Sequence, residues 1–278
     1  MPFNIQKLSS FSDGLSGGNP AGVLISETLP SAEQMQKIAA DVGFSETVFA
    51  MPENGAWRTR YFSPESEVPF CGHATIALGA ALAEAQGDGE FQLKLNDADI
   101  SVSGIKSANL VEASLQSPPT RSEPADPSLI QDTLKLFGYS PEDLDETIPT
   151  GLAHAGATHV IIALNSREKL AQMSYDLEAG RDFMNAHGLV TIAFIFNETP
   201  QLFHVRNAFA SGGVTEDPTT GAAAAAFAGY LRDIDWPHNG SLTLIQGEDM
   251  GLRSIINVKF STVAGSSITV SGTVRPLT

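Results

Sequence analysis

The sequence predicts a mixed α/β protein of two pseudo-symmetric domains, each a curved, barrel-like sheet wrapped around a central buried helix. Three observations support this fold class. Short β-rich stretches dominate the chain, their order occurs twice, and each half contains one helix that is apolar on every side. A helix that is apolar all round must be buried all round, so two such helices among strands predict two enclosing sheets.

In the first half, runs of β-branched and aromatic residues predict strands. An amphipathic helix is expected over 31–42, with Ser31 as its N-cap and apolar residues at helical spacing. The first buried helix follows Gly72 and includes the apolar run 76–83. The strands are expected at 3–8, 21–25, 46–51, 57–63, 91–95, 100–102 and 110–115.

The second half repeats this order around a second apolar helix, which begins after Gly221 and covers 222–231. Its strands are expected at 158–164, 190–196, 202–205, 241–245, 255–260 and 267–274. The segments that begin at Arg60 and Arg206 are also alike, so we interpret the two halves as an internal duplication. The Pro- and Ser-rich run 117–127 is the expected linker between them.

Composition excludes several classes of function. The formal net charge of -16 repels phosphate backbones and anionic membrane surfaces, so neither nucleic acid nor membrane is an expected partner. No run of about 18 apolar residues is present, and the N-terminal residues lack the pattern of a signal peptide. The single cysteine, Cys71, excludes an intramolecular disulfide and a multi-thiolate zinc site, and fits a reducing cytoplasm. No metal site is expected from the scattered histidines.

The starts of the two buried helices are the expected chemical centre. A helix N-terminus carries unpaired N–H groups and about half a positive charge, so two converging ends would bind a carboxylate without lysine or arginine. Gly72 and Gly221 would let a ligand approach the backbone closely. The alternative is that both glycines only permit turns.

Three polar side chains near these helices are candidate site residues. His73 follows Gly72 directly, where an imidazole can contact a bound ligand. Asp217 precedes the second helix, either as a cap or turn residue or as a proton-handling group. Glu46 lies in an apolar, strand-like run, where burial would raise its pKa towards values useful for acid/base chemistry; the alternative is a solvent-facing position.

Other chemistries are not expected. The glycine-rich loop 17–22 lacks the spacing of the nucleotide-binding glycine motifs, so no NAD, FAD or ATP site is predicted. Cys71 lies next to the expected site, but a two-thiol racemase needs a second cysteine that the chain does not have.

Five segments, taken together and in order, resemble the PhzF-like phenazine-biosynthesis isomerases. They are Gly18-Asn19-Pro20-Ala21-Gly22-Val23, Gly43-Phe44-Ser45-Glu46-Thr47, Glu67-Val68-Pro69-Phe70-Cys71-Gly72-His73-Ala74-Thr75, Glu216-Asp217-Pro218-Thr219-Thr220-Gly221 and Gln246-Gly247-Glu248-Asp249-Met250-Gly251. The resemblance runs from about residue 3 to the C-terminus. It implies a diaminopimelate-epimerase-like fold in which the last strand packs into the first domain. The domains are then expected at 1–117 with 262–278, and at 118–261.

The resemblance also implies a cofactor-independent, homodimeric isomerase. In phenazine producers such an enzyme isomerises trans-2,3-dihydro-3-hydroxyanthranilate. By this resemblance, Glu46 would move the proton, and His73 and Asp217 would orient the substrate. Substrate contacts are expected at Asn19, Gly72, Gly221 and Ala222. Family members usually have serine where this chain has Ala222, so the expected substrate is a small carboxylate rather than that compound in particular.

We therefore expect an isomerase that shifts a proton with Glu46 as general acid/base in the cleft between the domains. One alternative is a racemase or epimerase that uses Glu46 and Asp217 as opposed bases. Another is a protein that binds a small acid without catalysis.

Overall fold

The computed structural model describes residues 4–107 and 110–277 of the chain, which divides into two compact units. Unit 1 consists of Met1–Gln116 with Ser271–Thr278, and unit 2 consists of Ser117–Val270. Segment 262–270 thus lies in unit 2, whereas the sequence analysis assigned it to the first domain. The domain ranges expected from the sequence stay a prediction.

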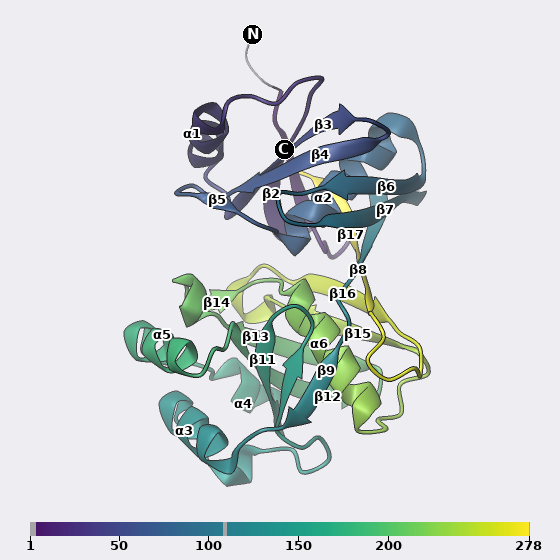
Figure 1. Ribbon diagram of the computed structural model, residues 1–278. Helices are drawn as coiled ribbons and strands as arrows, with labels where there is room; N and C mark the ends of the chain where they lie inside the picture. The colour runs from purple at the N-terminus through teal and green to yellow at the C-terminus, as the bar shows by residue number, and fades with distance from the viewer. Residues whose placement is uncertain (1–3, 108–109, 278) are drawn as a thin grey trace. The chain divides into compact units, whose positions relative to one another are not determined.

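Unit 1 is a sheet folded around one helix, α2 (Figure 1). Its helices are α1 (Ala32–Val42) and α2 (Gly72–Gln86). Its strands are β1 (Gln6–Ser10), β2 (Asn19–Ile25), β3 (Glu46–Glu53), β4 (Ala56–Phe62), β5 (Glu67–Val68), β6 (Gly89–Lys94), β7 (Asp99–Ser107) and β8 (Leu110–Gln116).

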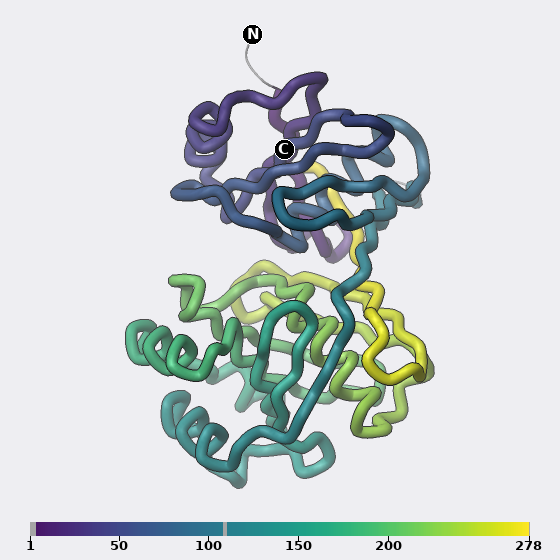
Figure 2. The backbone as a smooth tube through the Cα atoms, viewed as in Figure 1, coloured from purple at the N-terminus to yellow at the C-terminus, as the bar shows by residue number. Residues whose placement is uncertain are grey.

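The last strand, β17 (Thr269–Pro276), returns to unit 1 and pairs antiparallel with β1, where Ser10 lies opposite Val274. The chain path in Figure 2 leaves unit 1 after β8 and comes back to it only with this C-terminal segment. The packing of the last strand on the first half, which the resemblance implied, is therefore present.

Unit 2 surrounds helix α6 (Gly221–Asp233) and carries further helices on its outside, α3 (Pro127–Phe137), α4 (Arg167–Ala171) and α5 (Leu177–Ala186) (Figure 1). Its strands are β9 (Arg121–Pro124), β10 (Gly151–His154), β11 (Thr158–Leu164), β12 (Thr191–Thr199), β13 (Leu202–Ala208), β14 (Glu216–Asp217), β15 (Ser241–Gln246) and β16 (Ser254–Lys259). Short 3-10 helices cover Pro141–Asp143, Ala210–Gly212 and Glu248–Met250.

The two units share one strand connectivity. The parallel pair β2–β3 corresponds to β11–β12, and the antiparallel pair β3–β4 corresponds to β12–β13. Each unit then adds a two-residue strand, β5 or β14, before its central helix. After the helix, β6 runs parallel to β4 as β15 runs parallel to β13. The order that the sequence predicts twice is thus present twice.

A shared ion pair explains why Arg60 and Arg206 begin similar segments. Arg60 of β4 donates from Nε and Nη2 to the carboxylate of Glu67 in β5, at 2.7 and 2.5 Å. Arg206 of β13 makes the equivalent pair with Glu216 of β14, with Nε 3.0 Å from Oε1. Such bidentate pairs fix geometry as well as adding energy, and here they hold each short strand in front of its helix.

Helix α1 forms as its sequence predicts. Ser31 caps it: the Ser31 hydroxyl accepts from the Gln34 N–H, and the Gln34 side chain accepts from the Ser31 N–H. Gly43 ends the helix in the left-handed conformation that favours glycine. Met35 and Ala39 lie one turn apart and are both buried against the sheet.

The central helices are rich in alanine and glycine because the surrounding strands approach them closely. A Cβ placed on Gly79 of α2 would lie 2.5 Å from Cγ2 of Val102 in β7. One placed on Gly229 of α6 would lie 2.7 Å from Cβ of Thr120. Residues 74–83 and 223–232 are buried, which confirms the prediction from their apolar composition.

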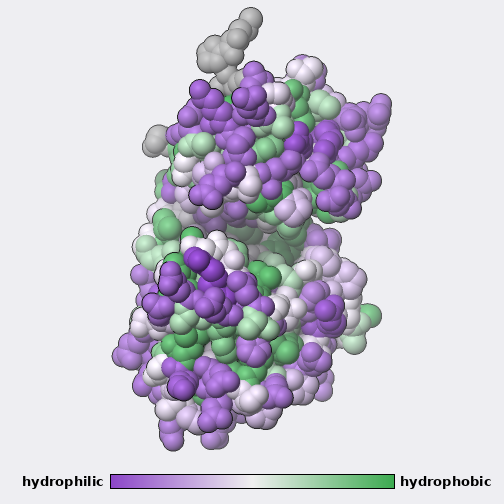
Figure 3. Space-filling model, turned by 60° about the vertical axis from the view of Figure 1, so that its left-hand side comes forward, coloured by the Kyte–Doolittle hydropathy of each residue, from purple (hydrophilic) through white to green (hydrophobic). Residues whose placement is uncertain are grey.

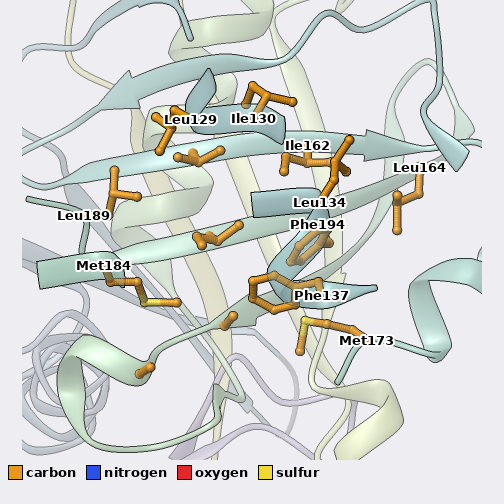
Figure 4. Close-up of a cluster of buried hydrophobic side chains, with 14 of the residues drawn as sticks. Leu129, Ile130, Leu134, Phe137, Ile162, Leu164, Met173, Met184, Leu189 and Phe194 are labelled. Carbon is orange, nitrogen blue, oxygen red and sulfur yellow. The ribbon is translucent and has the colours of Figure 1, made fainter. Parts of the chain in front are cut away.

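The outer helices of unit 2 were not anticipated from the sequence. Figure 4 shows Leu129, Leu134 and Phe137 of α3 packed on the face of β11 and β12, with Met184 of α5 beside them. The ring centroids of Phe137 and Phe194 lie 4.6 Å apart. Amphipathic helices of this kind cover the side of the sheet that faces away from α6.

The predicted linker 117–127 begins where the chain passes from unit 1 to unit 2, but it also contains strand β9, which pairs antiparallel with β10. Its prolines are compatible with a strand since Pro124 occupies the last position, where no ladder N–H is needed. Asp126 then caps α3 by accepting from the Ser128 N–H.

Hydrophilic residues cover most of the surface visible in Figure 3, and hydrophobic residues gather in smaller patches. Within the described residues, no helix is both long and apolar enough to cross a membrane.

Candidate functional site

A carboxylate and an imidazole meet at the start of the central helix of unit 1. Glu46 is the first residue of β3, where it lies opposite Ala21 of β2. His73 is the second residue of α2. His73 Nε2 lies 3.4 Å from Glu46 Oε2, with 9% of the imidazole and 22% of the carboxylate side chain exposed. The Glu46 side chain is therefore neither deeply buried nor fully solvent-facing.

Further contacts hold His73 in place. Its Nδ1 lies 3.3 Å from Cys71 Sγ, and its Nε2 lies 3.4 Å from Ser45 Oγ. The Ser10 hydroxyl donates to the His73 carbonyl oxygen at 2.7 Å. The sequence analysis assigned no role to Ser45 or Ser10. The position of Ser45 next to Glu46 was the available signal, whereas Ser10 becomes visible only when β1 packs against α2.

Asn19 lies on the same part of unit 1. It begins β2, is buried, and pairs in register with Ser10, the residue that binds the backbone of His73. The preceding Gly18 has a φ of 82°, and a Cβ there would lie 2.6 Å from the Ser10 carbonyl oxygen. The glycine-rich loop thus packs closely against the backbone of β1, and Asn19 follows it as the first residue of β2.

The two central helices differ from the other helices at their N-termini. The N-cap side chains of α1, α3, α4 and α5 accept from backbone N–H groups of the first turn. The N-caps of α2 and α6, Cys71 and Thr220, make no such side-chain bond in the described part of the chain. Capping normally satisfies these N–H groups, so the uncapped ends can bind an anion instead.

Gly72 is not required by packing inside unit 1. The nearest atom that a Cβ on Gly72 would meet is Phe70 Cε1, at 4.0 Å, which is an ordinary contact. Glycine in a helix costs about 0.5–1 kcal/mol relative to alanine. A glycine that the packing does not require, at an uncapped helix start, is what close approach of a ligand to the backbone would need.

In unit 2, Asp217 belongs to a self-contained loop. Its Oδ1 accepts from the Thr219 N–H at 3.2 Å, and its Oδ2 accepts from the Thr220 hydroxyl at 2.7 Å. The N-cap position of α6 belongs to Thr220 rather than to Asp217. The predicted turn role therefore describes these bonds better than the cap role does.

Gln246, the last residue of β15, clamps this loop. Its Nε2 donates to the Asp217 carbonyl oxygen at 2.7 Å, and its Oε1 accepts from the Thr220 N–H at 3.1 Å. Gly247 follows with a φ of 71°, and a Cβ there would lie 2.7 Å from the Pro218 carbonyl oxygen. The Gln-Gly motif seen in the sequence thus fixes the loop that precedes α6.

A buried polar chain continues from Gln246 into the unit. Asn207 Nδ2 donates to Gln246 Oε1, and Asn207 Oδ1 accepts from the hydroxyl of Thr191, at 3.2 Å in both cases. The Thr191 hydroxyl lies 2.7 Å from His159 Nδ1. Burial lowers the pKa of His159 to about 3, so this imidazole stays neutral.

Gly221 and Ala222 are the first two residues of α6 and are only partly buried. Ala222 follows its glycine as His73 follows Gly72, so a methyl group stands where unit 1 has an imidazole.

The side chains around the start of α2 also include three that could bind a metal ion. One atom each from Glu46, Cys71 and His73 lie within 4.8 Å of one another. The sequence analysis expected no metal site because it considered thiolate pairs and helical histidine pairs, and this mixed set forms only when β3 and α2 come together.

Comparisons with known proteins agree with the fold. The family model described as "Phenazine biosynthesis-like protein" (PhzC-PhzF) matches residues 8–275. An uncharacterized isomerase of Mesorhizobium japonicum is 32% identical over 266 residues, which cover 89% of this chain and 87% of that protein. The trans-2,3-dihydro-3-hydroxyanthranilate isomerase of Pseudomonas chlororaphis is 29% identical over 256 residues, 90% of this chain and 87% of that enzyme. A Bacillus anthracis crystal structure described as a PhzF-family phenazine biosynthesis protein superposes with a TM-score of 0.87 at 23% identity, covering 100% of this chain and 98% of that one.

Proposed function

Because this chain belongs to the phenazine biosynthesis-like family and is an isomerase, we propose that it shifts a proton on a small carboxylate-bearing substrate with Glu46 as general acid/base. The observation that carries the proposal is the Glu46–His73 pair beside the uncapped start of α2. In this arrangement the Glu46 carboxylate lies next to the first-turn N–H groups of α2, which can bind an anion.

The role of Glu46 follows from what its oxygens contact. Glu46 Oε2 lies 3.4 Å from His73 Nε2, and 22% of the Glu46 side chain is exposed. The carboxylate of Asp217, by contrast, accepts from its own loop through both oxygens. Of these two acidic groups, Glu46 is therefore the better proton acceptor for a substrate carbon.

Substrate binding uses the first-turn N–H groups of α2, with the carboxylate of the substrate held near Gly72. Such a site binds an anion with backbone N–H groups and needs no lysine or arginine. It therefore supplies a local positive potential in a chain with a net charge of -16. We assign Gly221, Ala222 and Asp217 to substrate contacts made by unit 2, and Asn19 to contacts made by unit 1.

In the reaction, the Glu46 carboxylate removes a proton from a carbon that is conjugated with the substrate carboxylate, and Glu46 becomes a carboxylic acid. The electron pair of the broken C–H bond delocalises onto that carboxylate, where the helix N–H groups stabilise the charge. Glu46 then returns the proton to a second carbon. His73 positions the Glu46 carboxylate through their contact. The shift is redox-neutral, so it needs no external electron acceptor.

Homodimer formation and a cytoplasmic location, both expected from the sequence, stay predictions. Light scattering on the purified chain tests the first of these directly.

The test is proton NMR in D2O of trans-2,3-dihydro-3-hydroxyanthranilate with the wild type and with Glu46→Gln. Isomerisation with deuterium incorporation by the wild type would show that the chain accepts this compound although it has Ala222 in place of serine. The glutamine side chain cannot accept the proton, so turnover should fall by about 10²–10⁴-fold. Binding of the compound by calorimetry should be retained, which separates a lost base from a lost fold. Undiminished turnover in Glu46→Gln would refute the central role of this residue.

A further inference from the structure

Within unit 1, the three side chains that converge at the start of α2 have the donor set of a transition-metal site. They offer one carboxylate oxygen, one thiol sulfur and one imidazole nitrogen, all within 4.8 Å. Zinc is bound in proteins by this combination of sulfur, nitrogen and oxygen ligands. We propose that Glu46, Cys71 and His73 bind Zn²⁺, and that the ion blocks the isomerase by occupying its acid/base.

The nitrogen–oxygen distance fits a tetrahedral ion, and the sulfur lies near enough to complete the set. Zn–N, Zn–O and Zn–S bonds of ordinary length give a nitrogen–oxygen edge of about 3.4 Å and a nitrogen–sulfur edge of about 3.6 Å. His73 Nε2 lies 3.4 Å from Glu46 Oε2 and 3.9 Å from Cys71 Sγ. The first edge therefore already matches. The sulfur lies nearer to Nδ1, at 3.3 Å, so an ion bound at Nε2 requires Cys71 Sγ to move towards that nitrogen.

The surroundings supply the rigidity that a metal site needs. The Ser10 hydroxyl holds the backbone of His73, and the Cys71 carbonyl accepts from both the N–H and the hydroxyl of Thr75. Cys71 and His73 thus belong to one ordered helical turn, while Glu46 comes from the neighbouring strand. Three protein ligands leave a fourth position for water, as in zinc sites that stay accessible.

The consequence for activity rests on the proposed function of Glu46. A carboxylate oxygen bound to Zn²⁺ cannot remove a proton from carbon, so metal binding and turnover exclude each other. Cys71 carries no proton in the proposed reaction, so the metal site is tested by metal binding to a Cys71 variant and the role of Glu46 by turnover.

Cobalt(II) is the probe for the site, because a thiolate ligand gives Co²⁺ a charge-transfer absorption band and the chain has a single cysteine. We expect one equivalent of Co²⁺ to produce this band in the wild-type protein and Zn²⁺ to displace it. Cys71→Ser should lose the band, and its Zn²⁺ affinity by calorimetry should fall by at least about 10–100-fold. Glu46→Gln should keep the band with weakened affinity, which covers the case of a poorly folded serine variant.

His204→Ala is the matched control. His204 also lies between carboxylates, 2.6 Å from Glu198 and 3.1 Å from Glu248, but it has no thiol beside it. This variant should bind Co²⁺ with the same band as the wild type. Absence of the band from the wild type, or unchanged Zn²⁺ affinity in Cys71→Ser, would overturn the metal site while leaving the Glu46→Gln result intact. If the site binds Zn²⁺ and turnover persists in the saturated protein, the inhibitory role is overturned.

Discussion

The start of α2 and the start of α6 occupy the same place in a repeated strand order, yet their side chains have diverged. Glu46 lies opposite Ala21 on the parallel pair of unit 1, and the equivalent pair in unit 2 brings Thr191 opposite His159. The position of the carboxylate is thus taken in unit 2 by a buried hydroxyl that belongs to a hydrogen-bond chain.

Both units keep the uncapped helix entry. At its helix start unit 1 adds the Glu46–His73 pair, whereas Ala222 takes the position of the imidazole in unit 2. The repeated scaffold therefore has two uncapped helix starts, and the proposed function assigns proton transfer to one of them. A single base suits a proton shift, while a racemase with opposed bases would need an equally available group in unit 2.

Replacing Asp217 by Asn tests most directly whether unit 2 contributes a second base. If the Asp217 carboxylate only orders its loop and substrate, the variant should lose about tenfold in turnover, the cost of one weakened charge-assisted hydrogen bond. Glu46→Gln should lose far more. Turnover and deuterium incorporation are measured for both variants in parallel, and the two losses of activity are compared. Equal losses would support the two-base racemase and remove the asymmetry.

The clamp of unit 2 makes a second prediction. Gly247→Ala places a Cβ on a left-handed residue, 2.6 Å from the Leu252 carbonyl oxygen, and should cost about 2–4 kcal/mol of unfolding free energy. Gly251→Ala is the control, since its φ is also left-handed, at 73°, but its Cβ would meet open space. Urea denaturation of both variants tests this, and equal losses would show that the close contact contributes nothing.

The buried chain of unit 2 predicts a dependence of stability on pH. The unfolded chain protonates His159 near its ordinary pKa of 6.5, whereas burial keeps the folded pKa at about 3. Stability is therefore complete above about 6.5 and falls as the pH drops towards 3, by about 2 kcal/mol between pH 7 and pH 5. His159→Asn should remove that part of the pH dependence, measured as unfolding free energy at both values. An unchanged slope would mean that His159 is not the group responsible.

The smallest expected stability change concerns Gly72→Ala, and its sign is opposite to its effect on binding. Alanine should stabilise the fold by about 0.5–1 kcal/mol because packing leaves room for a methyl group. Substrate binding should weaken, since that methyl group occupies the approach to the helix N–H groups. Thermal denaturation and calorimetry measure the two effects. Gly79→Ala, in the same helix but packed against Val102, should destabilise instead. A binding affinity unchanged by Gly72→Ala would remove the carboxylate site from α2.

Much of the fold could be predicted from the sequence because its signals are local. The apolar helices, the Ser31 N-cap and the strand order all depend on neighbouring residues, and the structure confirms them. The edge strand β9 was missed because its proline-rich composition is typical of a linker, and only its pairing with β10 makes it a strand.

The candidate site was harder to predict because its contacts join distant segments. His73 meets Glu46, and Asn207 meets Gln246, only after the sheets have formed. The sequence pointed to Glu46, His73 and Asp217 as separate candidates. It could not show that the Asp217 carboxylate bonds within its own loop, or that Cys71 joins the other two residues as a third ligand atom.

Strand β17 has a consequence for how the molecule is made. Unit 1 holds the first residues of the chain, but its strand β1 receives a partner from residues 274–276. During synthesis, unit 2 is complete before that partner leaves the ribosome, although the segments of unit 1 emerged first. Domains usually fold in order of emergence, and here the earlier segments must wait with β1 unpaired on one side. Glu46, the proposed acid/base, therefore belongs to the unit that is completed last.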